Sequence, residues 1–140
     1  MTRNRLDHLF QHCADVGIEV DWAPLGEKRR GEYWWHEDRI VLSLRLTAAQ
    51  AVSTLAHELG HRKFGDRCSS PAAERRAWEY GAAFLIEPRE YRAAEEAVGH
   101  HVSALAIELG VTVKLIEAWR RWWTTKGQFL EDAPERSVSD

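Results

Sequence analysis

The feature that most constrains the fold of this chain is the segment His57-Glu58-Leu59-Gly60-His61, which lies inside a predicted helix. Residues four apart stand one above the other on one face of an α-helix, so both imidazoles can reach a single metal ion. Glu58 follows the first histidine and is expected beside the same ion. A fold of this chain therefore has to present one face of this helix to a metal-binding cleft.

The donor types in this segment point to zinc. Imidazole nitrogens are common zinc ligands, and a catalytic zinc site has three protein ligands and one open position. We therefore predict that His57 and His61 bind Zn²⁺ and that Glu58 is the general base of a zinc peptidase. The alternative interpretation is a solvated helix face with histidines at i and i+4, and the caps of the surrounding helix favour the metal site.

The flanking sequence predicts an α+β fold in which a small antiparallel sheet precedes the motif helix and packs against it. Thr47 and Gln50 form a capping box at the start of the motif helix, which is expected to end near Phe64. Apolar periodicity predicts the elements before it. These are a helix over residues 6–16, a strand over 18–22 and a hairpin over 32–44.

A third zinc ligand is expected downstream of the motif. The nearest carboxylates there belong to Asp66, Glu74, Glu79 and Glu87. Ser70-Pro71 predicts the start of a second helix over residues 72–86. On this helix Glu74 shares a stripe with small and apolar residues and should face the motif helix, whereas Glu79 lies about 140° around it and should face solvent. A favourable charge near a helix N-terminus is the other interpretation of Glu74. Beside the histidine motif, we prefer the third ligand.

Two blocks of this sequence resemble the ImmA/IrrE zinc metallopeptidases. The first is Leu55-Ala56 followed by the histidine motif, and the second is Glu74-x-x-Ala77-x-x-Tyr80-Gly81-x-x-Phe84-Leu85 ending near Pro88. The resemblance covers roughly residues 31–88. It implies a small sheet on the motif helix, makes Glu74 the third zinc ligand, and connects the chain to proteins of bacteria and mobile elements that are commonly paired with helix-turn-helix repressors.

The second block departs from the family pattern in several places. Gly81 and Phe84 replace an alanine and a leucine, and Pro88 sits one residue late. Arg62-Lys63 also places charge where zinc peptidases usually carry apolar residues. These changes leave the predicted metal site intact and bear on the shape of the substrate cleft.

The C-terminal region has the spacing of a helix-turn-helix unit, with a small residue in the first helix and glycine in the turn. The residues that fit are Leu105, Ala106, Leu109, Gly110, Val111, Ile116 and Trp119. The positions that would face a DNA groove include one cation, Lys114, and one anion, Glu117, which suits phosphates and bases poorly. We therefore predict a helical pair that completes the core or covers the cleft, and the pattern argues against DNA binding.

The expected organisation is a metallopeptidase-like domain over residues 1–98, a helix-turn-helix-like segment over 99–127 in the same compact unit, and a disordered polar tail over 128–140. A formal net charge of −3 argues against non-specific coating of nucleic acid. No apolar run suits a signal peptide or membrane span, so a cytoplasmic protein is expected. Cys13 and Cys68 lack metal or redox spacing and are predicted to be free thiols.

The sequence as a whole favours a zinc-dependent endopeptidase that cleaves a specific cytoplasmic regulator, such as a helix-turn-helix repressor. The strand over residues 39–44 precedes the motif helix and is expected to be the sheet edge that receives an extended substrate. Two alternatives stay open. One is a non-catalytic regulatory or antitoxin-like binding protein on the same fold, and the other is a DNA-binding regulator with a structural zinc.

Overall fold

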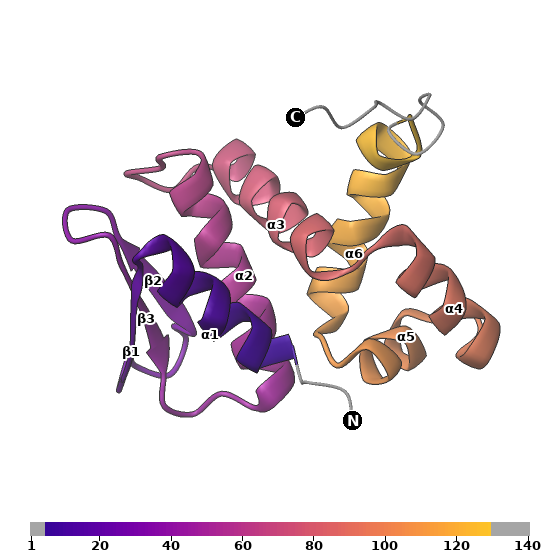
Figure 1. Ribbon diagram of the computed structural model, residues 1–140, viewed down its shortest axis with the longest axis horizontal. Helices are drawn as coiled ribbons and strands as arrows, with labels where there is room; N and C mark the ends of the chain where they lie inside the picture. Colours follow the sequence, from indigo (N-terminus) through magenta and orange to yellow (C-terminus); the bar gives the residue numbers. More distant parts are fainter. Residues whose placement is uncertain (1–4, 130–140) are drawn as a thin grey trace.

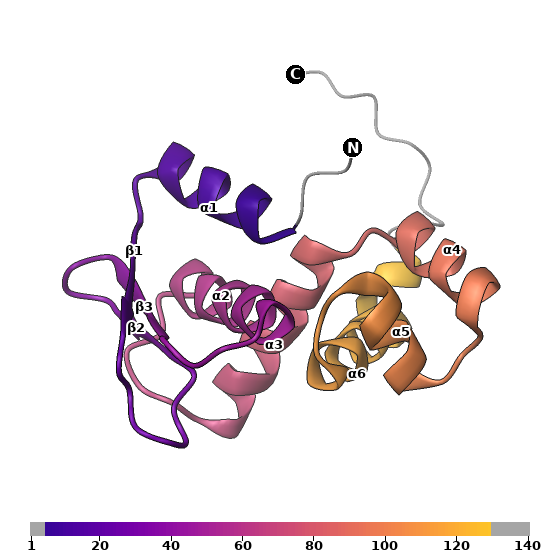
Figure 2. The ribbon, with the colours of Figure 1, turned by 90° about the horizontal axis from the view of Figure 1, so that it is seen from below.

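The computed structural model describes residues 5–129, and within this range the chain has an α+β fold. A three-stranded sheet packs with helices α1 (Arg5–Val16) and α2 (Ala48–Lys63), and α3 (Pro71–Leu85) also lies against α2 (Figure 1, Figure 2). The helices that follow are α4 (Pro88–Val98), α5 (Val102–Leu109) and α6 (Val113–Trp122). No helix in this described range has both the length and the apolar character of a membrane span.

The sheet is mixed, which corrects the predicted antiparallel arrangement. Strand β3 (Arg39–Ser43) lies between β1 (Glu19–Ala23) and β2 (Gly31–Trp34), parallel to the first and antiparallel to the second. The hairpin of β2 and β3 was predicted, but the central position of β3 was not. Its unbroken apolar run from Ile40 to Leu42 is buried, and since successive side chains point to opposite faces of a strand, both faces of β3 are covered. The predicted edge strand over residues 39–44 is therefore wrong, and β2 is an edge strand instead.

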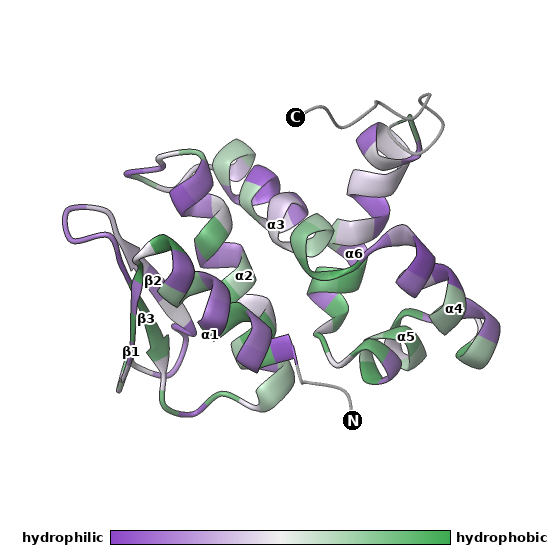
Figure 3. Cartoon of the chain, in the orientation of Figure 1, coloured by the Kyte–Doolittle hydropathy of each residue, from purple (hydrophilic) through white to green (hydrophobic). Residues whose placement is uncertain are grey.

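Helix α1 contributes one apolar stripe to the core. Leu9 and Cys13 are buried against residues of the sheet and of α2, and Gly17 ends the helix with a φ of 81°. The outer face of α1 is mostly hydrophilic, whereas β3 is hydrophobic (Figure 3). Burial raises the pKa of the Cys13 thiol to about 11, so this group stays protonated at neutral pH. Both Cys13 and Cys68 are free thiols, as predicted.

The motif helix α2 lies in the middle of the molecule. Both hydrogen bonds of the predicted capping box are present: Gln50 N–H donates to the Thr47 hydroxyl, and Thr47 N–H donates to the Gln50 side chain. Every residue from Ala51 to His61 is buried. The polar stripe of α2 therefore does not line a wide cleft but is covered by neighbouring elements.

Helices α2 and α3 approach each other closely because each carries a glycine at the contact. A Cβ atom on Gly60 would lie 2.4 Å from the backbone oxygen of Ala77, and a Cβ on Gly81 would lie 2.7 Å from the backbone oxygen of Ala56. Ser70 caps α3 by accepting from the Ala73 N–H, and Pro71 occupies its first position, as predicted. The contact between the two backbones fixes how far the first turn of α3 lies from the histidines.

The predicted C-terminal helical pair is α5 and α6, joined by Gly110 with a φ of 71°. Helix α6 packs against α3, and the indole N–H of Trp119 donates to the Ile86 carbonyl oxygen at 2.9 Å. A π-helical turn, Trp123–Gly127, follows α6. Of the predicted disordered tail, Gln128 and Phe129 are helical, and residues 130–140 lie outside the described range.

Candidate metal centre

The two histidines of the motif lie on one face of α2 and are almost completely buried. Their ring centroids are 4.6 Å apart, and each side chain is 11% exposed. One potential ligand atom each of His57, Glu58 and His61 lies within 4.8 Å of the others. The structure thus brings together the three residues that the motif singles out.

Glu74, in the first turn of α3, faces both imidazoles. Its Oε1 lies 2.9 Å from His57 Nε2, and its Oε2 lies 2.9 Å from His61 Nε2. The predicted orientation of Glu74 toward the motif helix is therefore confirmed. Its role as a zinc ligand stays a prediction, but two imidazole nitrogens and a carboxylate directed at one point are the donor set that zinc prefers.

Glu74 is suited to act as an anionic ligand. Its burial opposes ionisation, but the Ser69 hydroxyl donates to Oε2 at 2.9 Å, and His57 and His61 lie beside it. Together these contacts hold the pKa of Glu74 below its ordinary value. The carboxyl group is therefore ionised at neutral pH.

Asp66 contacts the opposite side of His61 from Glu74. Its Oδ2 lies 3.0 Å from His61 Nδ1, and its Oδ1 accepts from Arg76 at 3.0 Å. A carboxylate at Nδ1 fixes the tautomer that leaves Nε2 free to bind a metal, and it holds the ring in place. The sequence suggested Asp66 only as one of four downstream carboxylates, and no spacing rule assigned it this role.

Trp78 holds the ring of His57. The indole stacks on the imidazole with centroids 4.2 Å apart and an angle of 14° between the planes. Lys114 on α6 places its Nζ 4.9 Å from the Trp78 ring centroid. Helical periodicity places Trp78 on the same stripe of α3 as Glu74, but no sequence pattern indicates this contact with a candidate ligand.

Glu58 faces a small cavity of about 130 Å³ beside the histidines. The cavity is also lined by His61 and Glu74, and on the side of the sheet by Tyr33. Glu58 is 5% exposed, and its Oε2 lies 3.3 Å from His57 Nδ1. A carboxylate at this position can exchange a proton with a water molecule or peptide group in the cavity.

Glu79 does not face solvent, contrary to the sequence prediction. It is 7% exposed, and its oxygens lie 3.6 Å from Arg121 Nε and 3.6 Å from Lys126 Nζ. Helical periodicity identifies the face of α3 that meets α2, but it does not show that α6 and the following turn cover a second face of α3. Glu79 thus pairs with cations and is not among the groups around the histidines.

Arg62 has a defined partner, which accounts for the charge after the motif. Its guanidinium donates to both oxygens of Asp38, at 2.8 and 3.1 Å, and the Tyr33 hydroxyl donates to the same carboxylate at 3.0 Å. The hydrogen bonds from Arg62 hold the pKa of Asp38 below its ordinary value, and burial raises the pKa of Tyr33. The ion pair between Arg62 and Asp38 therefore connects the end of α2 to the β2–β3 turn.

Two packed helices bring His57, Glu58, His61 and Glu74 together and give the chain a metallopeptidase-like fold. The chain belongs to the family described as IrrE N-terminal-like domain, peptidase M78, whose sequence model matches residues 13–118. The resemblance to ImmA/IrrE proteins is thereby confirmed.

Comparison with solved structures shows the same fold in a Mycobacterium tuberculosis transcriptional regulator. The two chains superpose with a TM-score of 0.65 at 23% sequence identity. The match covers 90% of this chain and 43% of the regulator, so this chain spans less than half of that protein. A search of curated proteins found no significant match.

Proposed function

We propose that this chain is a zinc-dependent endopeptidase in which His57, His61 and Glu74 bind the metal and Glu58 is the general base. The observation that carries this proposal is the position of Glu74, whose two oxygens each lie 2.9 Å from the Nε2 atom of a different motif histidine. When bound, zinc would supply a Lewis acid that polarises the scissile carbonyl and lowers the pKa of a water molecule.

Residues of the chain would transfer the proton and hold the two histidines in position. Glu58 accepts the proton of the attacking water and passes it to the leaving amine when the peptide bond breaks. Asp66 keeps the Nδ1 atom of His61 protonated, and the stacked indole of Trp78 keeps the ring of His57 in position. The near-complete burial of both histidines excludes bulk water from the donors.

The substrate would bind as an extended strand along β2. This strand is an edge of the sheet, contacts α2, and contributes Tyr33 to the cavity that contains Glu58. Addition of a peptide strand to a sheet edge supplies main-chain hydrogen bonds without requiring a particular sequence. The substrate therefore has to offer a flexible segment, such as a linker or a frayed helix end.

We further propose a specific substrate, a helix-turn-helix repressor acting in the cytoplasm. The support is the family resemblance, since the IrrE N-terminal-like model matches residues 13–118. The test is gel analysis of the purified chain with a helix-turn-helix repressor from a neighbouring gene and, separately, with unstructured casein.

The repressor should be cut at one exposed site while casein stays intact, and the Glu58→Gln variant should cut neither, because an amide cannot accept the proton of water. Digestion of casein with an intact repressor would contradict the proposed substrate. Cleavage by Glu58→Gln at the wild-type rate would contradict the mechanism.

A second candidate function is a regulator that binds DNA or protein without cleaving it. The observation in its favour is the superposition on a chain described as a transcriptional regulator, together with the α5–α6 pair. Against it, much of α6 is committed to packing on α3, and Lys114 lies over Trp78. Repressor binding by the wild type without cleavage, even with zinc present, would favour this candidate.

A further inference from the structure

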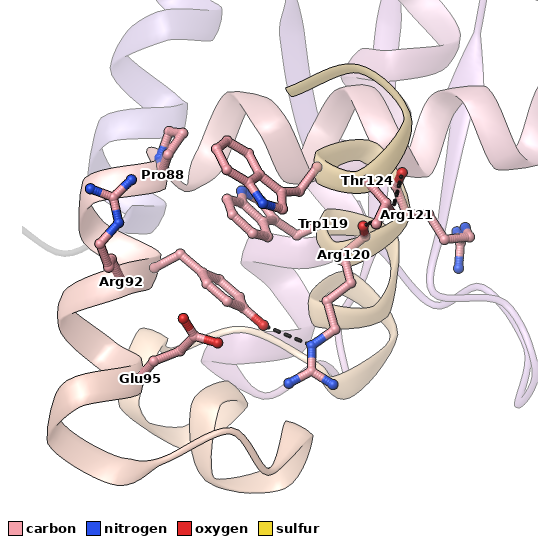
Figure 4. A pocket seen from close by; sticks show the side chains of 9 residues that line it. Pro88, Arg92, Glu95, Trp119, Arg120, Arg121 and Thr124 are labelled. Atoms are coloured by element: carbon pink, nitrogen blue, oxygen red, sulfur yellow. Dashed lines mark hydrogen bonds between the residues drawn. The ribbon is translucent and has the colours of Figure 1, made fainter. Parts of the chain in front are cut away.

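A second cavity, of about 420 Å³, lies between α4 and α6 and shares no lining residue with the cavity beside the histidines (Figure 4). The residues that give it chemical character are Tyr91, Arg92, Glu95, Trp119, Arg120 and Trp123. Cavities of this size commonly hold small molecules. The proposed peptidase reaction makes no use of it.

One wall of this cavity is a row of nearly parallel aromatic rings. The rings of Tyr91 and Trp119 stack with centroids 3.9 Å apart and a 7° angle between planes. Trp123 continues the row at 5.5 Å from Trp119 with a 10° angle. The hydrogen bond from Trp119 to the Ile86 carbonyl anchors the row to the core. Tyr91 and Trp119 are only 4% and 3% exposed and cover each other's faces, so a flat ligand ring can contact their edges and stack on Trp123, the partly exposed outer ring.

The polar groups of the cavity favour an anion. Arg120 donates from Nε to the Tyr91 hydroxyl at 2.8 Å and from Nη2 to the His100 carbonyl oxygen, which holds its guanidinium beside the rings. These two bonds account for two of the five N–H donors of an arginine. Arg92 adds a second cation from α4, and the carboxylate of Glu95 lies 2.8 Å from His100 Nδ1.

The backbone of this wall departs from α-helical geometry. Trp123 begins the π-helical turn Trp123–Gly127, and a Cβ atom on Gly127 would lie 2.8 Å from side-chain atoms of both Trp122 and Trp123. Single π-helical turns are rare and are frequent at functional sites. This feature is independent of the charge and the ring stacking.

We propose that this cavity binds a small aromatic anion, a flat ring that carries a carboxylate or phosphate group. The ring stacks on Trp123 and contacts the edges of Tyr91 and Trp119. The anionic group is bound by the guanidinium groups of Arg120 and Arg92, which present planar pairs of donors suited to either oxyanion. This proposal does not depend on the peptidase activity.

The test is a titration of the full chain by calorimetry and saturation-transfer NMR, with probes that distinguish an aromatic phosphate from an aromatic carboxylate. The probes are adenosine 5′-monophosphate and indole-3-acetate, with adenosine, indole and inorganic phosphate as partial analogues. At least one aromatic anion should bind saturably, and its neutral analogue and phosphate should bind at least about tenfold more weakly, because each lacks one set of contacts. Absence of saturable binding by both aromatic anions up to millimolar concentrations would overturn the proposal.

Two variants and a matched control locate the site. Arg92→Gln removes an exposed cation, and we expect it to weaken binding about tenfold, whereas Arg89→Gln on the same helix should bind as the wild type does. Trp123→Ala removes the outer ring and should weaken binding by a similar factor. If the two lining variants bind as tightly as Arg89→Gln, or if the neutral analogues bind as tightly as the anions, the proposed site is wrong.

Discussion

The substitution Gly60→Ala tests whether the close approach of α2 and α3 holds the metal centre together. The new Cβ would lie 2.4 Å from the Ala77 carbonyl oxygen and 2.7 Å from its Cα. Ordinary contacts begin at about 3.5 Å, so the helices have to separate by roughly 1 Å. Both atoms belong to the backbone, and no side-chain rotation can relieve the contact.

The expected cost follows from two opposing effects. Overpacking a core contact destabilises a protein by about 1–3 kcal/mol, and the rigid partner atoms place this case at the upper end. Alanine in a helix recovers up to about 1 kcal/mol relative to glycine. We therefore expect the metal-free protein to lose about 2 kcal/mol, which corresponds to a decrease of about 5–10 °C in Tm.

The same displacement should weaken zinc binding. Glu74 lies on the helix that moves, and metal–ligand distances tolerate only about 0.2 Å. Zinc affinity, measured by competition with a chromophoric chelator, should decrease at least about tenfold. Gly81→Ala should act in the same direction, and Arg75→Ala on the exposed side of α3 is the control. A Gly60→Ala protein with wild-type Tm and wild-type zinc affinity would refute the reasoning.

Three further changes test separate parts of the account. Asp66→Asn should weaken zinc binding about 10–100-fold with little change in the Tm of the metal-free protein, measured by the same competition assay, because the carboxylate at His61 Nδ1 is lost. Glu58→Gln should keep one zinc per chain and the wild-type Tm while peptide cleavage disappears. Asp38→Asn should make the free energy of unfolding depend less on pH in the acid range. The pKa of Asp38 is lower in the folded chain than its ordinary value of 3.8, so the ion pair with Arg62 stabilises the fold above pH 3.8. This stabilisation is lost as the pH falls through the pKa of the folded state. That contribution is below about 1 kcal/mol because the pair is partly exposed, and acid unfolding curves identical to wild type would contradict it.

Features set by local sequence could be predicted without the structure. The capping box of Thr47 and Gln50 marks the start of α2, and Ser70-Pro71 marks the start of α3, because these residues satisfy backbone groups within one turn. Helical periodicity also predicts that the Glu74 side chain points toward α2, provided that α2 is the helix on which α3 packs.

Features that depend on contacts distant in sequence could not be predicted. The β-branched and apolar residues of β3 identify it as a strand, but they do not say that it lies between β1 and β2. Glu79 was assigned to solvent because nothing in the sequence shows that α6 covers that face of α3. Asp66 reaches His61 only because the chain turns back after α2, and no spacing pattern encodes that turn.

The most direct test of the central claim is the zinc content of protein purified without added metal, comparing wild type with Glu74→Gln and Glu79→Gln. The two variants make the same chemical change on the same helix, but only Glu74 contacts the Nε2 atoms of His57 and His61. We predict one zinc per chain in the wild type and in Glu79→Gln, and a large loss in Glu74→Gln. A wild type without zinc, or a Glu74→Gln variant that retains it fully, would contradict the proposed metal centre.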